Sequence, residues 1–303
     1  MVELRTEIDE LKFDPPLILA SGILGQTSDS MEQVLEHGMG AVVTKSIGEE
    51  PRKGHPNPCM VEMEHGLLNA MGLPNPGIKE FEKEFQDLKV KVNEKPIIGS
   101  IFASDSDGFI DLSLQMEEMG AAAVELNLSC PHAEGYGAAI GTDPDEVKKM
   151  VEGVVGEVDI PVFAKLPPVN NIVDSAVSSE KAGADAIVAI NTVKAMAVNF
   201  ETRKPILGNE VGGYSGPAVK PIGLRCVYEI YEEIDIPIIG CGGVTTGRDA
   251  LEYIIAGASA LEIGSVIHYR GKEAPSKIAS EMDEMVKSEG MENISDLIGA
   301  AHK

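Results

Sequence analysis

Residues 181–190 read KAGADAIVAI, and this stretch contains the pattern that decides the fold. Gly183 stands where a helix is expected to end, since glycine adopts the left-handed conformation of a helix cap at little cost. Residues 186–190 are aliphatic without polar alternation, which is typical of a strand buried on both faces. The same transition recurs in EHGMGAVVT (36–44), EMGAAAVEL (118–126) and IAGASALEI (255–263). Four copies of one helix-to-strand unit predict a parallel sheet built from βα repeats.

Eight apolar runs of strand length occur along the chain, and segments of helical period separate them. Eight βα units close into a (β/α)8 barrel of the TIM type, whose active site lies at the carboxyl ends of the strands. An open doubly wound α/β sheet is the alternative. Because no linker interrupts the pattern, we expect residues 1–303 to form a single domain. The strands are expected at residues 17–20, 41–44, 96–102, 122–128, 161–166, 186–190, 237–239 and 258–263, and the helices at 30–37, 76–92, 107–119, 143–155, 171–182, 221–234 and 247–256.

Three segments lie outside this regular alternation. Residues 48–75 and 192–220 are longer than ordinary βα connections, so we expect them to be insertions over the carboxyl-end mouth of the barrel. Residues 1–14 are predicted to form a small N-terminal hairpin outside the barrel.

The charge balance excludes some classes of partner. The 303 residues include 49 Asp plus Glu and 25 Lys plus Arg, for a net charge of −24. Such a chain is poorly suited to nucleic acid or anionic lipid, because phosphate groups are bound by an excess of Lys and Arg. No apolar run reaches the roughly 20 residues of a membrane span, and no signal peptide is recognisable. The four Cys residues lack disulfide or metal spacing, so a cytoplasmic location is expected.

Polar residues follow the predicted strands at the end where a barrel carries its active site. A buried strand does not require such residues, and two lysines among them would concentrate positive charge at one mouth. We therefore interpret them as candidates for binding an anionic ligand. They are Ser21, Lys45, Ser46, Ser100, Asn127, Lys165, Asn191 and Thr192.

Glycine-rich turns follow the last two strands. Gly242 and Gly243 come after strand seven, and Gly264 and Ser265 come after strand eight. In barrels these two loops commonly bind phosphate through backbone N–H groups. Two ordinary glycine turns are the alternative, but the position of the pattern favours a phosphate-bearing cofactor such as FMN.

Cys130 follows the fourth strand and begins a glycine-rich loop, residues 130–141. A lone cysteine is usually a small buried apolar residue, but this setting suits a thiol that acts as general base beneath a mobile loop. The six His residues form no metal-binding pair, and the chain lacks the GxSxG motif of serine hydrolases. We expect neither a metal site nor a hydrolase.

Nine segments resemble those of the class 1 dihydroorotate dehydrogenases and occur in that family's order over nearly the whole chain. The resemblance implies a (β/α)8 barrel with FMN at its mouth, which oxidises dihydroorotate to orotate in pyrimidine biosynthesis. The segments are LILASGILG (17–25), VTKS (43–46), NAMGLPNPG (69–77), ELNLSCP (125–131), AKLPP (164–168), INTV (190–193), GGYSGPAVKP (212–221), IPIIGCGGV (236–244) and IGSVIH (263–268).

The resemblance also implies roles for individual residues. Cys130 matches the family's active-site base, and Lys165 would stabilise negative charge on the reduced flavin. The substrate contacts would come from Lys45, Asn69, Met71, Gly72, Leu73, Asn127, Asn191 and Thr192. The FMN contacts would come from Ser21, Lys45, Ser46, Ser100, Asn127, Lys165, Ile190, Gly216, Gly242, Gly243, Gly264 and Ser265.

Two positions depart from the family pattern. His132 stands where many members have Asn, and the related dihydropyrimidine dehydrogenases share this SCPH sequence. Ser100 occupies a position that is often Asn. A pyrimidine-base reductase is therefore one alternative. A second alternative is an RNA-modifying flavoprotein like the dihydrouridine synthases, which the acidic charge balance disfavours. A third is a non-catalytic flavin subunit, which the combination of Cys130 with both lysines disfavours.

Residues 190–221 look more like the class 1B branch than like the fumarate-dependent class 1A branch. Class 1B enzymes pass electrons to NAD through a separate subunit with FAD and a [2Fe–2S] cluster. This chain lacks the Cys spacing for such a cluster, so the resemblance implies a separate electron-transfer subunit and a homodimer within a heterotetramer.

Overall fold

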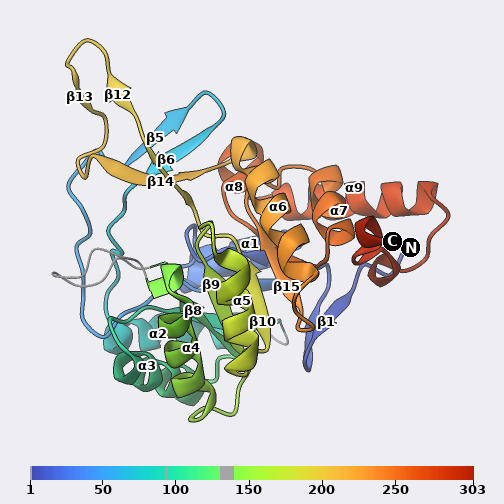
Figure 1. The fold of residues 1–303 in the computed structure, drawn as a ribbon, viewed down its shortest axis with the longest axis horizontal. Coiled ribbons are helices and arrows are strands. Elements are labelled where there is room, and N and C mark those ends of the chain that lie inside the picture. The colour runs from blue at the N-terminus through green and yellow to red at the C-terminus, as the bar shows by residue number, and fades with distance from the viewer. Residues whose placement is uncertain (1, 93–94, 130–139) are drawn as a thin grey trace.

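Eight parallel strands close into a barrel in the computed structural model, which describes residues 2–92, 95–129 and 140–303 (Figure 1). Each strand pairs with the next barrel strand along the chain, and the last pairs with the first. This closure confirms the predicted (β/α)8 barrel and rules out the open sheet. All eight predicted runs are barrel strands, with small shifts at their ends. They are β3 (Leu17–Leu19), β4 (Ala41–Val43), β7 (Ile97–Ile101), β8 (Ala123–Asn127), β9 (Val162–Leu166), β10 (Ala186–Ala189), β15 (Ile238–Cys241) and β16 (Ala258–Ile263).

Helices alternate with the strands and cover the outside of the barrel (Figure 1). The two helices after β16 were not predicted, although α9 has Ile278, Met282 and Val286 buried at four-residue spacing. No helix in the described ranges is long and apolar enough to span a membrane. The helices are α1 (Ser28–Glu36), α2 (Ile78–Lys91), α3 (Ser106–Met119), α4 (Pro144–Val155), α5 (Ile172–Lys181), α6 (Lys220–Tyr231), α7 (Gly247–Ile255), α8 (Val266–Arg270) and α9 (Ala274–Ser288), with 3-10 turns η1 (Ile140–Thr142), η2 (Pro217–Val219), η3 (Ile294–Leu297) and η4 (Ala300–His302).

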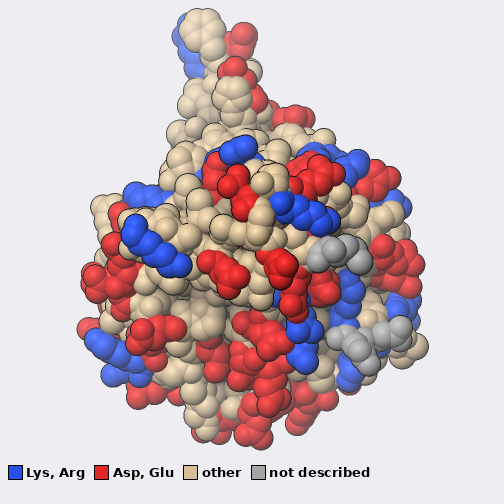
Figure 2. All heavy atoms as spheres, turned by 90° about the vertical axis from the view of Figure 1, so that its right-hand side faces the viewer, with Lys and Arg blue, Asp and Glu red and all other residues tan. Residues whose placement is uncertain are grey.

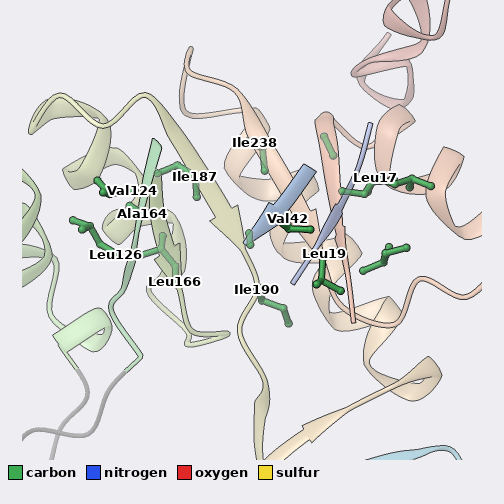
Figure 3. Close-up of a cluster of buried hydrophobic side chains, with 14 of the residues drawn as sticks. Leu17, Leu19, Val42, Val124, Leu126, Ala164, Leu166, Ile187, Ile190 and Ile238 are labelled. Carbon is green, nitrogen blue, oxygen red and sulfur yellow. The ribbon is translucent and has the colours of Figure 1, made fainter. Parts of the chain in front are cut away.

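The alternation of side chains along each strand produces two buried clusters. The outward set, which includes Leu17, Val42 and Leu126, packs against the helices (Figure 3). The inward set, which includes Ile18 and Phe163, fills the interior of the barrel. Full burial of one such aliphatic or aromatic side chain contributes about 1.5–3 kcal/mol. The near-continuous apolar character of the strands therefore reflects burial on both faces.

The predicted N-terminal hairpin is present as β1 (Thr6–Ile8) paired with β2 (Leu11–Phe13). It lies outside the barrel sheet, but Ile8 and Phe13 belong to the cluster inside the barrel and are fully buried. The hairpin contacts β16. Its side chains thus close the amino-terminal end of the barrel, opposite the end at which the site is expected.

The two long insertions form an antiparallel sheet of their own, in the order β11-β14-β6-β5. They follow β4 and β10, so the sheet begins at the carboxyl ends of barrel strands, and the β12–β13 hairpin projects farthest outward (Figure 1). Insertions were predicted at these positions, but the strands within them were not. The strands are β5 (Met60–Met63), β6 (Gly66–Asn69), β11 (Val193–Met196), β12 (Val198–Asn199), β13 (Lys204–Pro205) and β14 (Val211–Ser215).

Asp249 organises the turn that leads from β15 into α7. Its carboxylate accepts hydrogen bonds from the backbone N–H and hydroxyl groups of Thr245 and Thr246, and Lys220 donates to it at 2.7 Å. In return, Thr246 Oγ1 accepts a hydrogen bond from the Asp249 N–H, which completes a capping box at the start of α7. Burial alone would raise the pKa of Asp249, but the bonds from Lys220 and Thr245 outweigh it and lower this pKa to about 2.

Replacing Phe13→Ala should remove the apolar closure of the barrel's amino-terminal end. We expect the free energy of unfolding to fall by about 3–5 kcal/mol, because a buried phenyl group is lost and a cavity remains. Urea denaturation would measure the change. Lys12→Ala, on the exposed face of the same strand, is the matched control and should change the value by less than about 0.5 kcal/mol. Equal effects of the two changes would contradict a closing role for Phe13.

Asp249→Asn should destabilise the protein at pH 7 by about 1 kcal/mol, through the weakened cap. A carboxyl group with a lowered native pKa stabilises the fold above its unfolded value of about 3.9 and loses this effect as the pH falls toward the native value. The difference from wild type should therefore shrink between about pH 4 and pH 2 in urea denaturation. Glu252→Gln removes the other carboxylate that accepts from Lys220 and should have a smaller effect. A difference that does not depend on pH would contradict this assignment.

Candidate active site

Hydrogen bonds join four of the predicted residues at the carboxyl ends of neighbouring barrel strands. The Ser46 and Ser100 hydroxyl oxygens lie 2.9 Å apart, and the Asn127 amide donates to Ser46 Oγ at 3.1 Å. Asn191 Nδ2 donates to Asn127 Oδ1 at 3.2 Å. The chain segments that follow β4 and β10 are thereby connected to β7 and β8. The structure thus gathers amide and hydroxyl groups into one continuous polar layer.

Lys165 lies beside this layer, inside the barrel, and its ammonium group is bound by two carboxyl groups. Lys165 Nζ lies 3.2 Å from Glu125 Oε2 and also donates to Glu262 Oε2. The exposed fractions of the Lys165, Glu125 and Glu262 side chains are 5%, 0% and 1%. Burial alone would lower the pKa of Lys165, but the two carboxyl groups raise it above its ordinary value, so this lysine is charged.

Neither glutamate was among the site residues predicted from the sequence. Each is a single acid within an otherwise apolar barrel strand, at positions 125 in AVELN and 262 in ASALEI. That isolation was the available signal, because a charged residue inside a buried strand needs a partner. Asp249 and Lys220, which shape the turn after β15, were missed as well.

Lys45 and Ser21 are placed by the first two barrel strands. Ser21 is buried directly after β3, and Lys45 is partly buried after β4. The Lys45 N–H donates to the Gly25 carbonyl at 2.7 Å. A Cβ at residue 25 would lie 2.7 Å from the Lys45 nitrogen, so this close approach of two loops requires glycine.

The glycine-rich turns after β15 and β16 contain backbone N–H groups that point to an anion site. Within the described ranges, no protein group accepts a hydrogen bond from the N–H of Gly243, Gly264 or Ser265. Gly243 has a φ of +73°, and a Cβ there would lie 2.5 Å from the Lys220 nitrogen and 2.8 Å from the Gly216 oxygen. Gly216 and Gly242 also have positive φ, at +109° and +126°. Free amides at a turn that excludes side chains fit a phosphate group.

Ile190 connects this side of the barrel to the polar layer. Its side chain is buried, and its N–H donates to the Cys241 carbonyl at 2.9 Å. Burial raises the pKa of the Cys241 thiol to about 12, so Cys241 is a neutral thiol.

Cys130 and His132 lie outside the described residues.

The remaining predicted residues lie at the ends of two strands of the antiparallel sheet, β6 and β11. Asn69, on β6, donates from Nδ2 to the Gly213 carbonyl at 3.3 Å, and a Cβ at Gly213 would touch Thr192. Met71 is 39% exposed, and its carbonyl accepts from the His55 N–H. Gly72 and Leu73 have φ values of +74° and +54°.

These groups together suit a flat polar anion and a phosphate-bearing cofactor. Amide side chains can pair with both the donors and the acceptors of a heterocycle, and lysines supply positive charge. No group of three His, Cys, Asp or Glu side chains suited to a metal ion occurs in the described part of the chain.

Comparison with known proteins identifies the family. The family model described as dihydroorotate dehydrogenase matches residues 3–286. A protein of Pyrococcus horikoshii is 48% identical over 99% of this chain and 98% of its own length, and one of Thermoplasma acidophilum is 47% identical over 99% of both chains. One of Methanocaldococcus jannaschii is 45% identical over 99% of this chain and 98% of its own length. Each is named dihydroorotate dehydrogenase B (NAD(+)), catalytic subunit. The chain therefore belongs to the dihydroorotate dehydrogenase family.

Proposed function

We propose that this protein is the catalytic subunit of a dihydroorotate dehydrogenase, which oxidises dihydroorotate to orotate in pyrimidine biosynthesis with FMN as cofactor. The observation that carries the proposal is the polar layer of Asn127, Asn191 and Ser46 beside Lys165, on a barrel that matches this family over 284 of its residues, from 3 to 286. The names of the full-length relatives support it.

FMN would supply the acceptor for the hydride that leaves C6 of dihydroorotate. The free amides of Gly243, Gly264 and Ser265 would bind its phosphate. Its ring would lie against Lys165, whose positive charge would stabilise negative charge at the pyrimidine edge. The further cofactor contacts would come from Ser21, Lys45, Ser46, Ser100, Asn127, Ile190, Gly216 and Gly242.

Cys130 would act as the base that takes a proton from C5 of dihydroorotate. Asn127 and Asn191 would pair with the alternating donors and acceptors of the pyrimidine, while Lys45 would face its negative charge. The other substrate contacts would come from Asn69, Met71, Gly72, Leu73 and Thr192. The insertion sheet supports this arrangement, since Asn69 and Thr192 both lie next to Gly213.

A separate subunit would complete the electron path. We infer a partner with FAD and a [2Fe–2S] cluster that passes electrons to NAD. The names of the relatives, which are catalytic subunits of NAD(+) enzymes, support a separate subunit and NAD as the acceptor. A homodimer within a heterotetramer, a single catalytic domain and a cytoplasmic location are parts of the same proposal. Asp and Glu side chains cover much of the face in Figure 2, which supports the exclusion of nucleic acid as a partner.

Cys130→Ala should retain FMN but slow flavin reduction by dihydroorotate by several orders of magnitude, because the proton at C5 would lack its base. Stopped-flow absorbance of the flavin would measure this. Cys226→Ala, on α6 at the outside of the barrel, is the matched control and should reduce at the wild-type rate. Wild-type rates in Cys130→Ala would remove this residue from the mechanism. Reduction of the wild type by dihydrouracil instead would favour the pyrimidine-base reductase.

When the protein is purified from its own cells, a second, iron-containing flavoprotein subunit should copurify with it. With that subunit, dihydroorotate should reduce NAD, and without it NAD reduction should be lost while dihydroorotate still bleaches the flavin. Steady-state assays of the complex and of the isolated chain would separate the two. Turnover of the isolated chain with fumarate would instead assign the protein to class 1A.

A further inference from the structure

Inside the barrel, two carboxyl groups are opposed by one ammonium group. Lys165 on β9 is the basic side chain paired with Glu125 on β8 and with Glu262 on β16, and neither glutamate has a second basic partner in the described ranges. The Cys241 thiol on β15 and the Ser100 hydroxyl on β7 also lie at the cluster. With both glutamates ionised, this buried cluster would carry a net charge of −1. An uncompensated charge at this depth is strongly disfavoured.

The contacts within the cluster indicate where a proton resides. The Glu125 and Glu262 carboxyl groups both lie against Lys165 Nζ, so one ammonium group serves two buried acids. Lys165 donates to both acids, but Glu125 has a second donor, the Ser100 hydroxyl at 3.0 Å, whereas no second side-chain donor to Glu262 occurs in the described ranges. The additional hydrogen bond favours the ionised form of Glu125. Burial raises the pKa of Glu125, but Lys165 and these bonds outweigh it and lower that pKa. Burial and the neighbouring Glu125 charge raise the pKa of Glu262.

We propose that Glu262 holds a proton in the resting protein, so that Lys165, Glu125 and Glu262 form an electrically neutral unit beneath the active site. Glu262 is then a positioning residue. It orients the Lys165 ammonium through a hydrogen bond without adding a second negative charge. The Cys241 thiol, whose pKa is raised by burial, adds no charge either.

The charge of this cluster affects the reduction potential of bound FMN. This step rests on the proposed function. A flavin placed against Lys165 gains negative charge when it is reduced, and a net negative charge on the Lys165–Glu125–Glu262 cluster would oppose that gain. A protonated Glu262 leaves the cluster neutral, so that the nearby ammonium group dominates the electrostatic potential at the flavin. The reduction potential of bound FMN should therefore not change when Glu262 is replaced by a neutral isostere.

Infrared spectroscopy tests the proton directly and does not require FMN. At pH 7 the wild-type chain should show a carboxylic-acid C=O band that shifts in D2O. Glu262→Gln should lose this band. Glu125→Gln should lose it as well, because Glu262 then ionises to pair with Lys165. Cys241→Ser is the matched control and should keep it. Circular dichroism would verify that each variant is folded. A band that persists in folded Glu262→Gln, or that is absent in the wild type, would overturn the proposal.

A dye-coupled redox titration of the FMN-loaded proteins supplies the second readout. Glu262→Gln and Glu125→Gln should each alter the reduction equilibrium less than threefold. The double variant leaves Lys165 without a counter-charge and should favour reduction at least tenfold, which is about 30 mV for a two-electron couple. A tenfold increase in Glu262→Gln alone would mean that Glu262 is ionised in the wild type, and would overturn the proposal. Failure of the wild type to bind FMN would contradict the proposed function, while the infrared result would still decide the protonation of Glu262.

Discussion

The pairing of β16 with β3 is the constraint on which the rest of the structure depends. Leu261, Glu262 and Ile263 lie opposite Leu17, Ile18 and Leu19, and this register closes the barrel. Closure removes both edges of the sheet and gives every strand an inside and an outside. It also brings the turn after β16 next to the turn after β3, so that Gly264 faces Ala20. One inward position of the closing strand is occupied by Glu262, which puts a carboxyl group inside the barrel.

The interior of the barrel changes in character along its axis. The amino-terminal half is apolar, and the hairpin closes it with Ile8 and Phe13. Farther along, Lys165 and its two glutamates occupy the inside, and the amide and hydroxyl groups at the strand ends follow. Ion pairs in such surroundings contribute little net stability, since desolvation offsets their attraction. The cluster is better explained by what it presents to the mouth, a charged ammonium group held in one orientation.

Much of the fold and of the candidate site could be predicted from local pattern. Each barrel strand is an apolar run and most of the helices between them have a clear period, so these elements were predicted near their observed ends. The insertion strands were not, because β6 and β14 pair across 144 positions of the chain and neither has a strong pattern of its own. The polar residues at strand ends were found because a rule of the barrel locates them. The hydrogen bonds among these residues could not be predicted, since they depend on the stagger of the strands.

The sequence by itself determined the (β/α)8 class, the end of the barrel that carries polar groups, and the family to which its motifs belong. These conclusions depend on short-range periodicity and on the identity of residues at fixed positions. Only the tertiary structure decided that Glu125 and Glu262 share one lysine, and that the hairpin closes the barrel. These contacts join residues on different strands, 40 and 97 positions from Lys165 in the case of the glutamates, and no local pattern encodes their distance. The charge state of the site depends on those distances, because electrostatic interaction in a buried environment is governed by separation and solvent exclusion.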